Sequence, residues 1–200
     1  RDVLTGTLIA EPLMLETLFG PVKLSMEHVV AFDVIPKDLM GWLPTEEGLS
    51  LYYALDDGER ASNHAGDKLH GQVSMTGVTW LEKAKNGGGF EFEGNGRITV
   101  PHHTDVCPEK FTLAAWIFPR EQSHSYEMIM AKTSAGSWSG GYGLVRNSGD
   151  SKHLTFFINY YSGSGSEVKF AVPYDEWSHV AGTFDGRALT FYLNGQKAGE

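Results

Sequence analysis

The stretch "NHAGDKLHG", residues 63–71, gathers side chains that could do chemistry: two histidines, one aspartate and one asparagine. These residues are compatible with a metal site, a catalytic loop or a polar turn between strands. A zinc site would use His64, Asp67 and His70. Gly66 disfavours a helix, so the spacing of three does not align these ligands. A structural zinc site also needs four nitrogen or sulfur ligands, and no second Cys/His cluster accompanies this one. Zinc is therefore the weaker interpretation.

The composition of the whole chain excludes several function classes. The formal net charge is −9, from 16 basic and 25 acidic residues. This balance argues against nucleic acid as a partner, because phosphate binding needs clustered lysine and arginine. No apolar run approaches the roughly 18 residues of a membrane span. A single cysteine allows no disulfide framework within the chain.

The elements that must position these residues are short apolar segments with period-two alternation. The clearest are "FTLAAWIFP" (111–119), "HLTFFINY" (153–160) and "ALTFYLNG" (188–195). Such alternation is typical of half-buried strands. Asn194-Gly195 and Asp185-Gly186 are strong hairpin turn signals. Short strands separated by Gly, Asn and Asp turns predict an all-β fold, an antiparallel β-sandwich or jelly roll.

The first 43 residues differ from the rest and predict a small β-module with a turn at Phe19-Gly20-Pro21. The segment 36–48 carries two prolines and two glycines among polar residues, which is typical of a linker. We therefore expect two domains, a β-module over 1–43 and a sandwich over 44–200.

The order of the segments resembles that of a known family. "LSLYYALDDG" precedes "NHAGDKLHGQVS" and "GGGFEFEGNGRITVP", and "FTLAAWIFP", "YDEWSHVAGTFDG" and "LTFYLNGQ" follow. This succession, over roughly 49–200, resembles the laminin-G-like (concanavalin A-like) jelly-roll domains of bacterial extracellular proteins. The resemblance implies two curved antiparallel sheets. Family members continue with further strands after the last hairpin, so we expect a fragment of a longer chain that carries other domains.

The same resemblance suggests a cofactor for the 63–71 loop. In the family this loop often holds a structural calcium ion, and the matching positions are Asn63, Gly66, Asp67 and His70. Calcium takes six to eight oxygen ligands. Asn63 and Asp67 would offer side-chain oxygens, and Gly66 and His70 would offer backbone carbonyls. Asn63 replaces a charged family ligand with a neutral one.

Catalysis is the less favoured alternative. Glucanases that share the sandwich use alternating carboxylates in the pattern E-x-D-x-x-E, which places an acid and a nucleophile on one sheet face. The sequence "EFEG" offers Glu91 and Glu93 without a third carboxylate at the required offset. We therefore expect no enzyme activity.

Aromatic side chains are the candidate ligand-binding residues. Strict alternation places Trp116 on the face opposite Phe111, where a flat ring could stack on a sugar. Aromatics also stand in two polar, glycine-rich loops, where binding residues are common. The candidates are Trp116, Trp138, Tyr142, Tyr160 and Tyr161.

Together these features predict a non-catalytic recognition domain that binds carbohydrate or protein. The resemblance implies a secreted or cell-envelope protein of a bacterium. A structural or adhesion domain, or an accessory domain of a glycoside hydrolase, is the alternative.

Overall fold

The computed structural model describes residues 13–17, 20–24, 48–55, 58–121, 126–134, 137–147, 153–159 and 166–200. It divides into two compact units, Arg1–Leu49 and Ser50–Glu200. In the first unit, β1 (Leu13–Thr17) and β2 (Gly20–Leu24) form an antiparallel hairpin. The rest of the β-module predicted over 1–43 lies outside the described residues.

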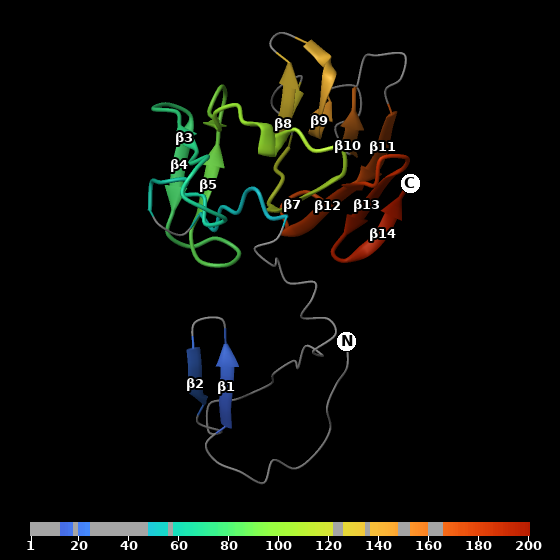
Figure 1. Cartoon of the computed structure of the whole chain (residues 1–200). Coiled ribbons are helices and arrows are strands. Elements are labelled where there is room, and N and C mark those ends of the chain that lie inside the picture. Colours follow the sequence, from blue (N-terminus) through green and yellow to red (C-terminus); the bar gives the residue numbers. More distant parts are fainter. Residues whose placement is uncertain are drawn as a thin grey trace. The chain divides into compact units, whose positions relative to one another are not determined.

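The regular secondary structure described in the second unit is almost entirely antiparallel β-strand (Figure 1). One 3-10 turn, η3 (Thr104–Val106), precedes the longer strands. The strands of this unit are β3 (Gln72–Val73), β4 (Val78–Leu81), β5 (Gly89–Phe92), β6 (Ile98–Thr99), β7 (Phe111–Ile117), β8 (Tyr126–Ser134), β9 (Ser137–Asn147), β10 (His153–Ile158), β11 (Ser166–Ala171), β12 (Ser178–Phe184), β13 (Leu189–Leu193) and β14 (Gln196–Gly199).

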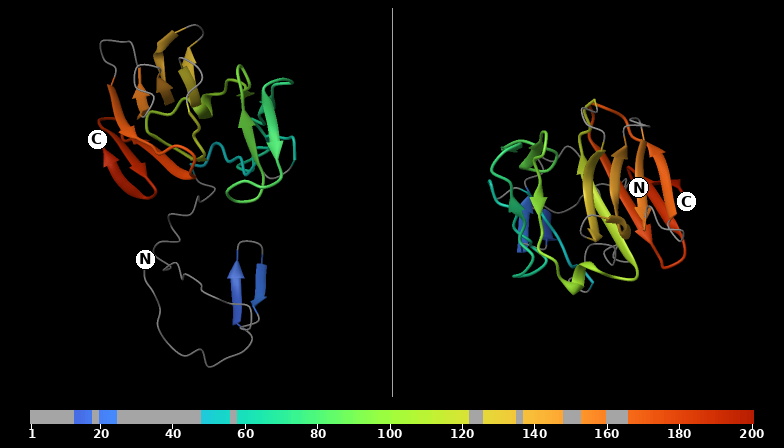
Figure 2. Two further views of the ribbon diagram at one scale, coloured as in Figure 1. Left: turned by 180° about the vertical axis from the view of Figure 1, so that it is seen from behind. Right: turned by 90° about the horizontal axis from the view of Figure 1, so that it is seen from above.

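Two four-stranded sheets form the sandwich. One has the order β11-β10-β9-β8 and the other β14-β13-β12-β7. The view from above shows them as two layers, with β3 to β6 on one side (Figure 2). The small strands pair separately, β3 with β6 and β4 with β5. The all-β antiparallel sandwich predicted from the sequence is thus confirmed.

The core lies between the two sheets. Phe156 of β10 and Phe191 of β13 are fully buried there, and the ring of Phe170 from β11 stacks on that of Phe191. Gly182 of β12 allows the sheets to approach. A Cβ at this position would lie 2.8 Å from three ring atoms of Phe156. Side-chain volume in this core is therefore tightly matched across the layers.

The predicted hairpin turn at Asn194-Gly195 is present, joining β13 to β14. Both residues have positive φ, 49° and 78°, as a two-residue type I′ turn requires. At the preceding turn, Gly186 has φ of 93°, and the Asp185 carboxylate accepts hydrogen bonds from the backbone of Arg187 and Ala188.

In the described part of the chain, no helix is both long and apolar enough for a membrane crossing.

Candidate functional site

Trp116 projects from the outer face of the β7/β12/β13/β14 sheet. The inward positions of β7, such as Phe111 and Leu113, pack against the core, and the alternating pattern leaves Trp116 41% exposed. The pairing of β7 with β12 is regular along its whole length and sets Trp116 directly opposite His179. No bulge turns the indole inward, so the outward position predicted by alternation is confirmed.

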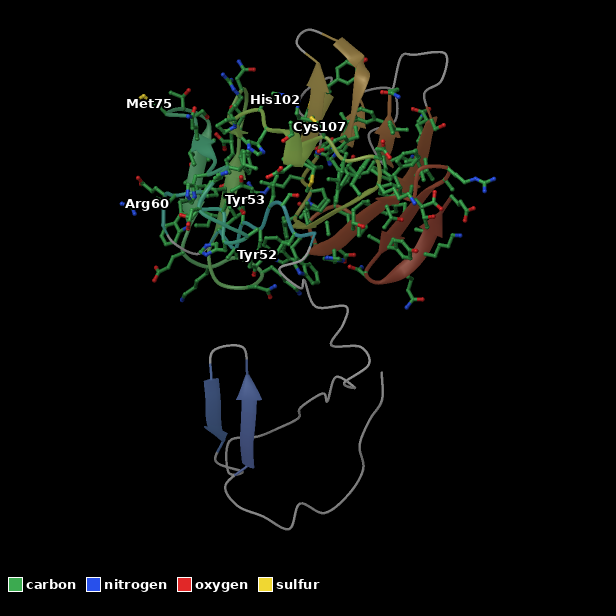
Figure 3. All side chains as sticks on the ribbon, viewed as in Figure 1. Tyr52, Tyr53, Arg60, Met75, His102 and Cys107 are labelled. Carbon is green, nitrogen blue, oxygen red and sulfur yellow. The ribbon has the colours of Figure 1, made fainter. Side chains whose placement is uncertain are left out.

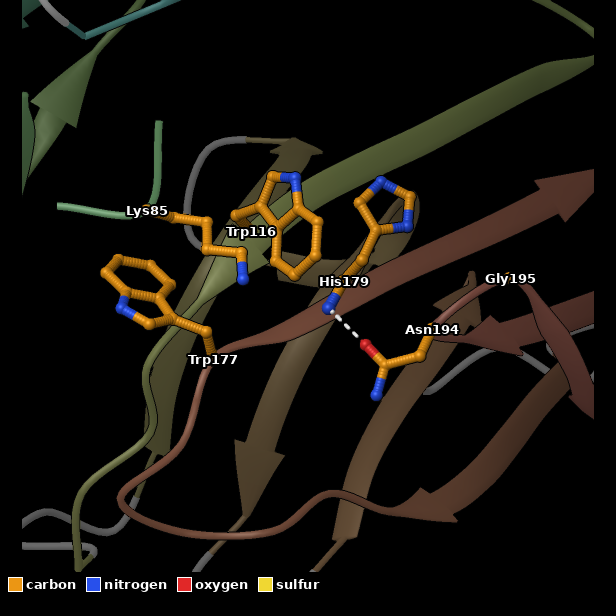
Figure 4. Close-up of a pocket in the computed structure, with 6 residues that line it drawn as sticks. All are labelled: Lys85, Trp116, Trp177, His179, Asn194 and Gly195. Atoms are coloured by element: carbon orange, nitrogen blue, oxygen red, sulfur yellow. Dashed lines mark hydrogen bonds between the residues drawn. The ribbon is translucent and has the colours of Figure 1, made fainter. Parts of the chain in front are cut away.

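Trp116 lines an open hollow of about 580 Å³ on this sheet (Figure 4). The side chains around it come from separate segments: the β4–β5 loop, β7, the start of β12 and the β13–β14 turn. The Lys85 ammonium lies 4.6 Å from the centre of the Trp116 ring, within the range of a cation–π contact. The lining residues are Lys85, Trp116, Trp177, His179, Asn194 and Gly195.

His179 forms one wall of this hollow. Its ring meets Trp116 edge-on, with the ring centres 5.2 Å apart. The His179 backbone N–H donates to Asn194 Oδ1, and the Asn194 N–H donates to the His179 carbonyl, each at 2.8 Å. Partial burial lowers the pKa of His179 below its ordinary 6.5, because desolvation penalises the charged imidazolium. The imidazole therefore favours its neutral form at neutral pH.

Trp177 stands at the other side of the hollow, immediately before β12. Its ring packs edge-on against Phe118, with centres 5.6 Å apart. The β4–β5 hairpin is held near the sheet by an ion pair between Glu91 of β5 and Arg120, just beyond β7. Three segments distant in sequence thus bring two indoles and an ammonium to one place.

The other predicted ligand-binding aromatics do not join this hollow in the described residues. Tyr142 of β9 packs against Phe111 with the rings tilted by 34° and their centres 4.3 Å apart, and its hydroxyl donates to the Val106 carbonyl at 2.8 Å. Tyr160 and Tyr161 lie outside the described residues.

The backbone of Trp138 belongs to β9, but its side chain is not among those that the structure describes. Ligand binding by Trp138, Tyr142, Tyr160 and Tyr161 stays a prediction.

The 63–71 loop is organised by the side chain of Asn63, which is only 6% exposed. Asn63 Oδ1 accepts hydrogen bonds from the backbone of Tyr52 at 2.9 Å and of Ala65 at 3.1 Å. Asn63 Nδ2 donates to the carbonyls of Ser50 at 3.2 Å and Lys68 at 2.8 Å. One amide therefore satisfies four backbone groups and joins the loop to the preceding segment.

Other side chains complete the same loop. The Asn63 N–H donates to His70 Nδ1 at 3.1 Å, and the Tyr53 hydroxyl donates to the Leu69 carbonyl. Tyr53 is labelled in Figure 3. Gly66 and Asp67 are exposed at the tip of the loop. His70 thus contributes a ring nitrogen to the loop, whereas the family resemblance assigned it a backbone carbonyl.

These hydrogen bonds determine which oxygen atoms of the loop could bind calcium. The Asn63 oxygen already accepts two hydrogen bonds, so it is not presented to an ion. An ion would rely on the Asp67 carboxylate and on carbonyl groups. Within the ranges described, no group of three or more His, Cys, Asp or Glu side chains could hold a metal ion. Calcium binding by the loop stays a prediction.

Sequence reasoning missed Lys85, Trp177, His179 and Asn194 as members of the site. The sequence predicts Asn194 only in a turn, and it does form that turn. His179 could have been found from its place on the outward face of a strand, since it alternates with Val180. Lys85 offers no such signal, because only the docking of the β4–β5 loop brings it to Trp116.

These features define a class of protein, an antiparallel β-sandwich with an aromatic hollow on one outer sheet face. The laminin G family model of the concanavalin A-like lectin/glucanases superfamily matches residues 92–200, which is more than half of the chain. The chain belongs to this superfamily, and the resemblance found in the sequence is confirmed. No curated protein and no solved structure matches it significantly.

Proposed function

We propose that this domain is a non-catalytic recognition module that binds carbohydrate in the hollow around Trp116. The observation that carries the proposal is the exposed Trp116 ring, which shares an open hollow of about 580 Å³ with Trp177. Sugar rings have apolar C–H faces, and a flat indole offers a matching surface. The hydrogen-bonding groups beside the two rings would fix the orientation of the sugar hydroxyls.

The absence of a carboxylate from the residues that line the hollow supports a role without catalysis. Glycoside hydrolysis uses two carboxyl groups on either side of the scissile bond. Glu91, one of the two carboxylates considered from the sequence, is held by Arg120. Glu93 is exposed and belongs to the turn after β5, where its carbonyl accepts from Gly96.

We further propose that the module works outside the cell or in the cell envelope, as one part of a larger protein. The support is the resemblance of the ordered segments to domains of bacterial extracellular proteins. A protein ligand is the second candidate, and the aromatic hollow suits it as well, since Trp is enriched at protein interfaces.

Binding to a glycan panel, followed by calorimetry on the oligosaccharides that bind, tests the proposal. Trp116→Ala is expected to weaken binding by about 2 kcal/mol, roughly 30-fold in Kd, as for a central aromatic anchor. Phe92→Ala is the matched control, because Phe92 is an aromatic of β5, 49% exposed, and lies outside the hollow. Equal losses in both variants, or release of reducing sugar from the bound glycan, would refute the proposal.

A further inference from the structure

The hollow differs in charge from the protein as a whole. The chain carries 25 acidic and 16 basic residues, yet the six residues that line the hollow include a lysine and no acid. Glu82 and Glu176 lie near lining residues in the sequence, but both are exposed and neither lines the hollow. An acidic surface thus contains a local site of opposite character, which favours an anionic ligand over a cationic one.

Lys85 supplies the positive charge. Among the described residues no carboxylate forms an ion pair with its ammonium. The ammonium lies over the face of the Trp116 ring. Because Lys85 is exposed on a loop and has a flexible stem, its ammonium can swing toward a ligand charge while the loop stays in place. A bound anion would give it a stronger partner than the indole face.

Three other free polar groups of the hollow are donors, and the neutral His179 imidazole adds one donor and one acceptor nitrogen. Asn194 Oδ1 accepts from the His179 backbone, and this bond fixes the amide orientation. Asn194 Nδ2 is left without a partner in the described part of the chain, and so are the indole N–H groups of Trp116 and Trp177. An indole N–H can only donate. A ligand rich in acceptor oxygens matches this set of donors.

We propose that the hollow binds an acidic glycan, with one sugar ring stacked on Trp116 and its carboxylate or sulfate ester paired with Lys85. The inference rests on the carbohydrate-binding function proposed above and names the class of sugar. A pyranose carries such an anionic group at the rim of the ring, so its apolar face stays available for stacking. Lys85 is then the residue that determines specificity, and Trp116 contributes affinity for neutral and acidic sugars alike.

Calorimetry with matched oligosaccharides tests this inference on the full chain. The probes are a galacturonate tetrasaccharide and its methyl ester, a sulfated galactan tetrasaccharide and its desulfated form, and an oligoglutamate peptide. The variants are Lys85→Gln, which removes the charge, and Lys85→Arg, which keeps it. Lys83→Gln is the matched control, because Lys83 is an exposed lysine of the same loop outside the hollow.

We expect at least one acidic tetrasaccharide to bind more tightly than its neutral form, and the two pairs distinguish carboxylate from sulfate. Lys85→Gln should weaken binding of the acidic sugar about fivefold, the size of one half-exposed charge contact, and leave the neutral form unchanged. Lys85→Arg and Lys83→Gln should both retain the preference.

Three results would overturn the inference. Equal affinity for acidic and neutral forms would remove the charge preference while leaving carbohydrate binding intact. Equal effects of Lys85→Gln and Lys83→Gln would show that only the overall charge matters. Binding of oligoglutamate as tight as that of the acidic sugar would favour an acidic protein partner. If no sugar of either kind binds, the proposed function itself fails.

Discussion

The hydrogen bonds of the Asn63 side chain predict how much stability the domain loses when this side chain is removed. Its amide is buried and joins four backbone groups of two segments, at Ser50, Tyr52, Ala65 and Lys68. Asn63→Ala removes both the acceptor and the two donors and puts no polar group in their place. Two N–H groups and two carbonyls then have to find water or remain without partners.

The expected cost follows from the number of bonds. A hydrogen bond contributes about 1 kcal/mol net, so four contribute about 4 kcal/mol. The partner residues are partly exposed, and water can replace some of these bonds, which lowers the expected loss to about 2–4 kcal/mol. For a domain of this size each kcal/mol shifts the melting temperature by about 2–4 °C, so Tm should fall by about 4–16 °C. The total free energy of unfolding of a domain is only about 5–15 kcal/mol.

Urea and thermal unfolding, followed by tryptophan fluorescence, measure this loss. Asn95→Ala is the control, because Asn95 is exposed and its side chain forms no hydrogen bond with the described residues. Asn63→Asp keeps the acceptor but loses both donors, so its stability should lie below that of the wild type even without calcium. A Tm for Asn63→Ala equal to that of Asn95→Ala would refute the reasoning.

The melting temperature also tests whether the 63–71 loop binds calcium. If the Asn63 amide organises the loop, EDTA should leave the wild-type Tm unchanged, since no ion is then needed to hold the loop. A wild-type Tm that falls with EDTA and recovers with calcium would show that the loop binds calcium, as the family resemblance suggests. Recovery by calcium in Asn63→Asp alone would show a loop that holds an ion once a charged ligand is restored.

Two further predictions concern the sheet that carries the hollow. Gly182→Ala should destabilise the domain by about 1–3 kcal/mol in urea unfolding, because the new Cβ would lie 2.8 Å from the buried Phe156 ring. Phe156→Leu in the same chain should recover part of that loss, and additive effects would contradict the clash. Folding lowers the pKa of His179. As the pH falls below 6.5, the unfolded chain therefore binds a proton at this residue more readily than the folded domain does. The wild type should therefore lose more stability than His179→Gln between pH 7 and pH 5, and parallel curves would argue against this.

Much of the fold could be predicted because its signals are local. Period-two alternation in "FTLAAWIFP" assigned Phe111 to the core and Trp116 to the outer face, and the regular pairing with β12 keeps that assignment. The Asn194-Gly195 turn followed from the need for positive φ. Alternation failed to describe β10 fully. It predicts a half-buried strand with one buried face, but four successive residues, 154–157, are all buried.

The candidate site was less predictable, because its parts are distant in sequence. The alternation of residues in β7 determined by itself that an indole would stand outside the core. Only the tertiary structure decided that Lys85 and Trp177 would meet Trp116, since a strand pattern carries no information about which loop docks on its outer face. Likewise, the sequence placed Asn63 in a polar loop, but the direction of its amide depends on backbone groups of another segment. Those partners exist only once the chain has folded, and they made Asn63 a hydrogen-bonding centre for the loop.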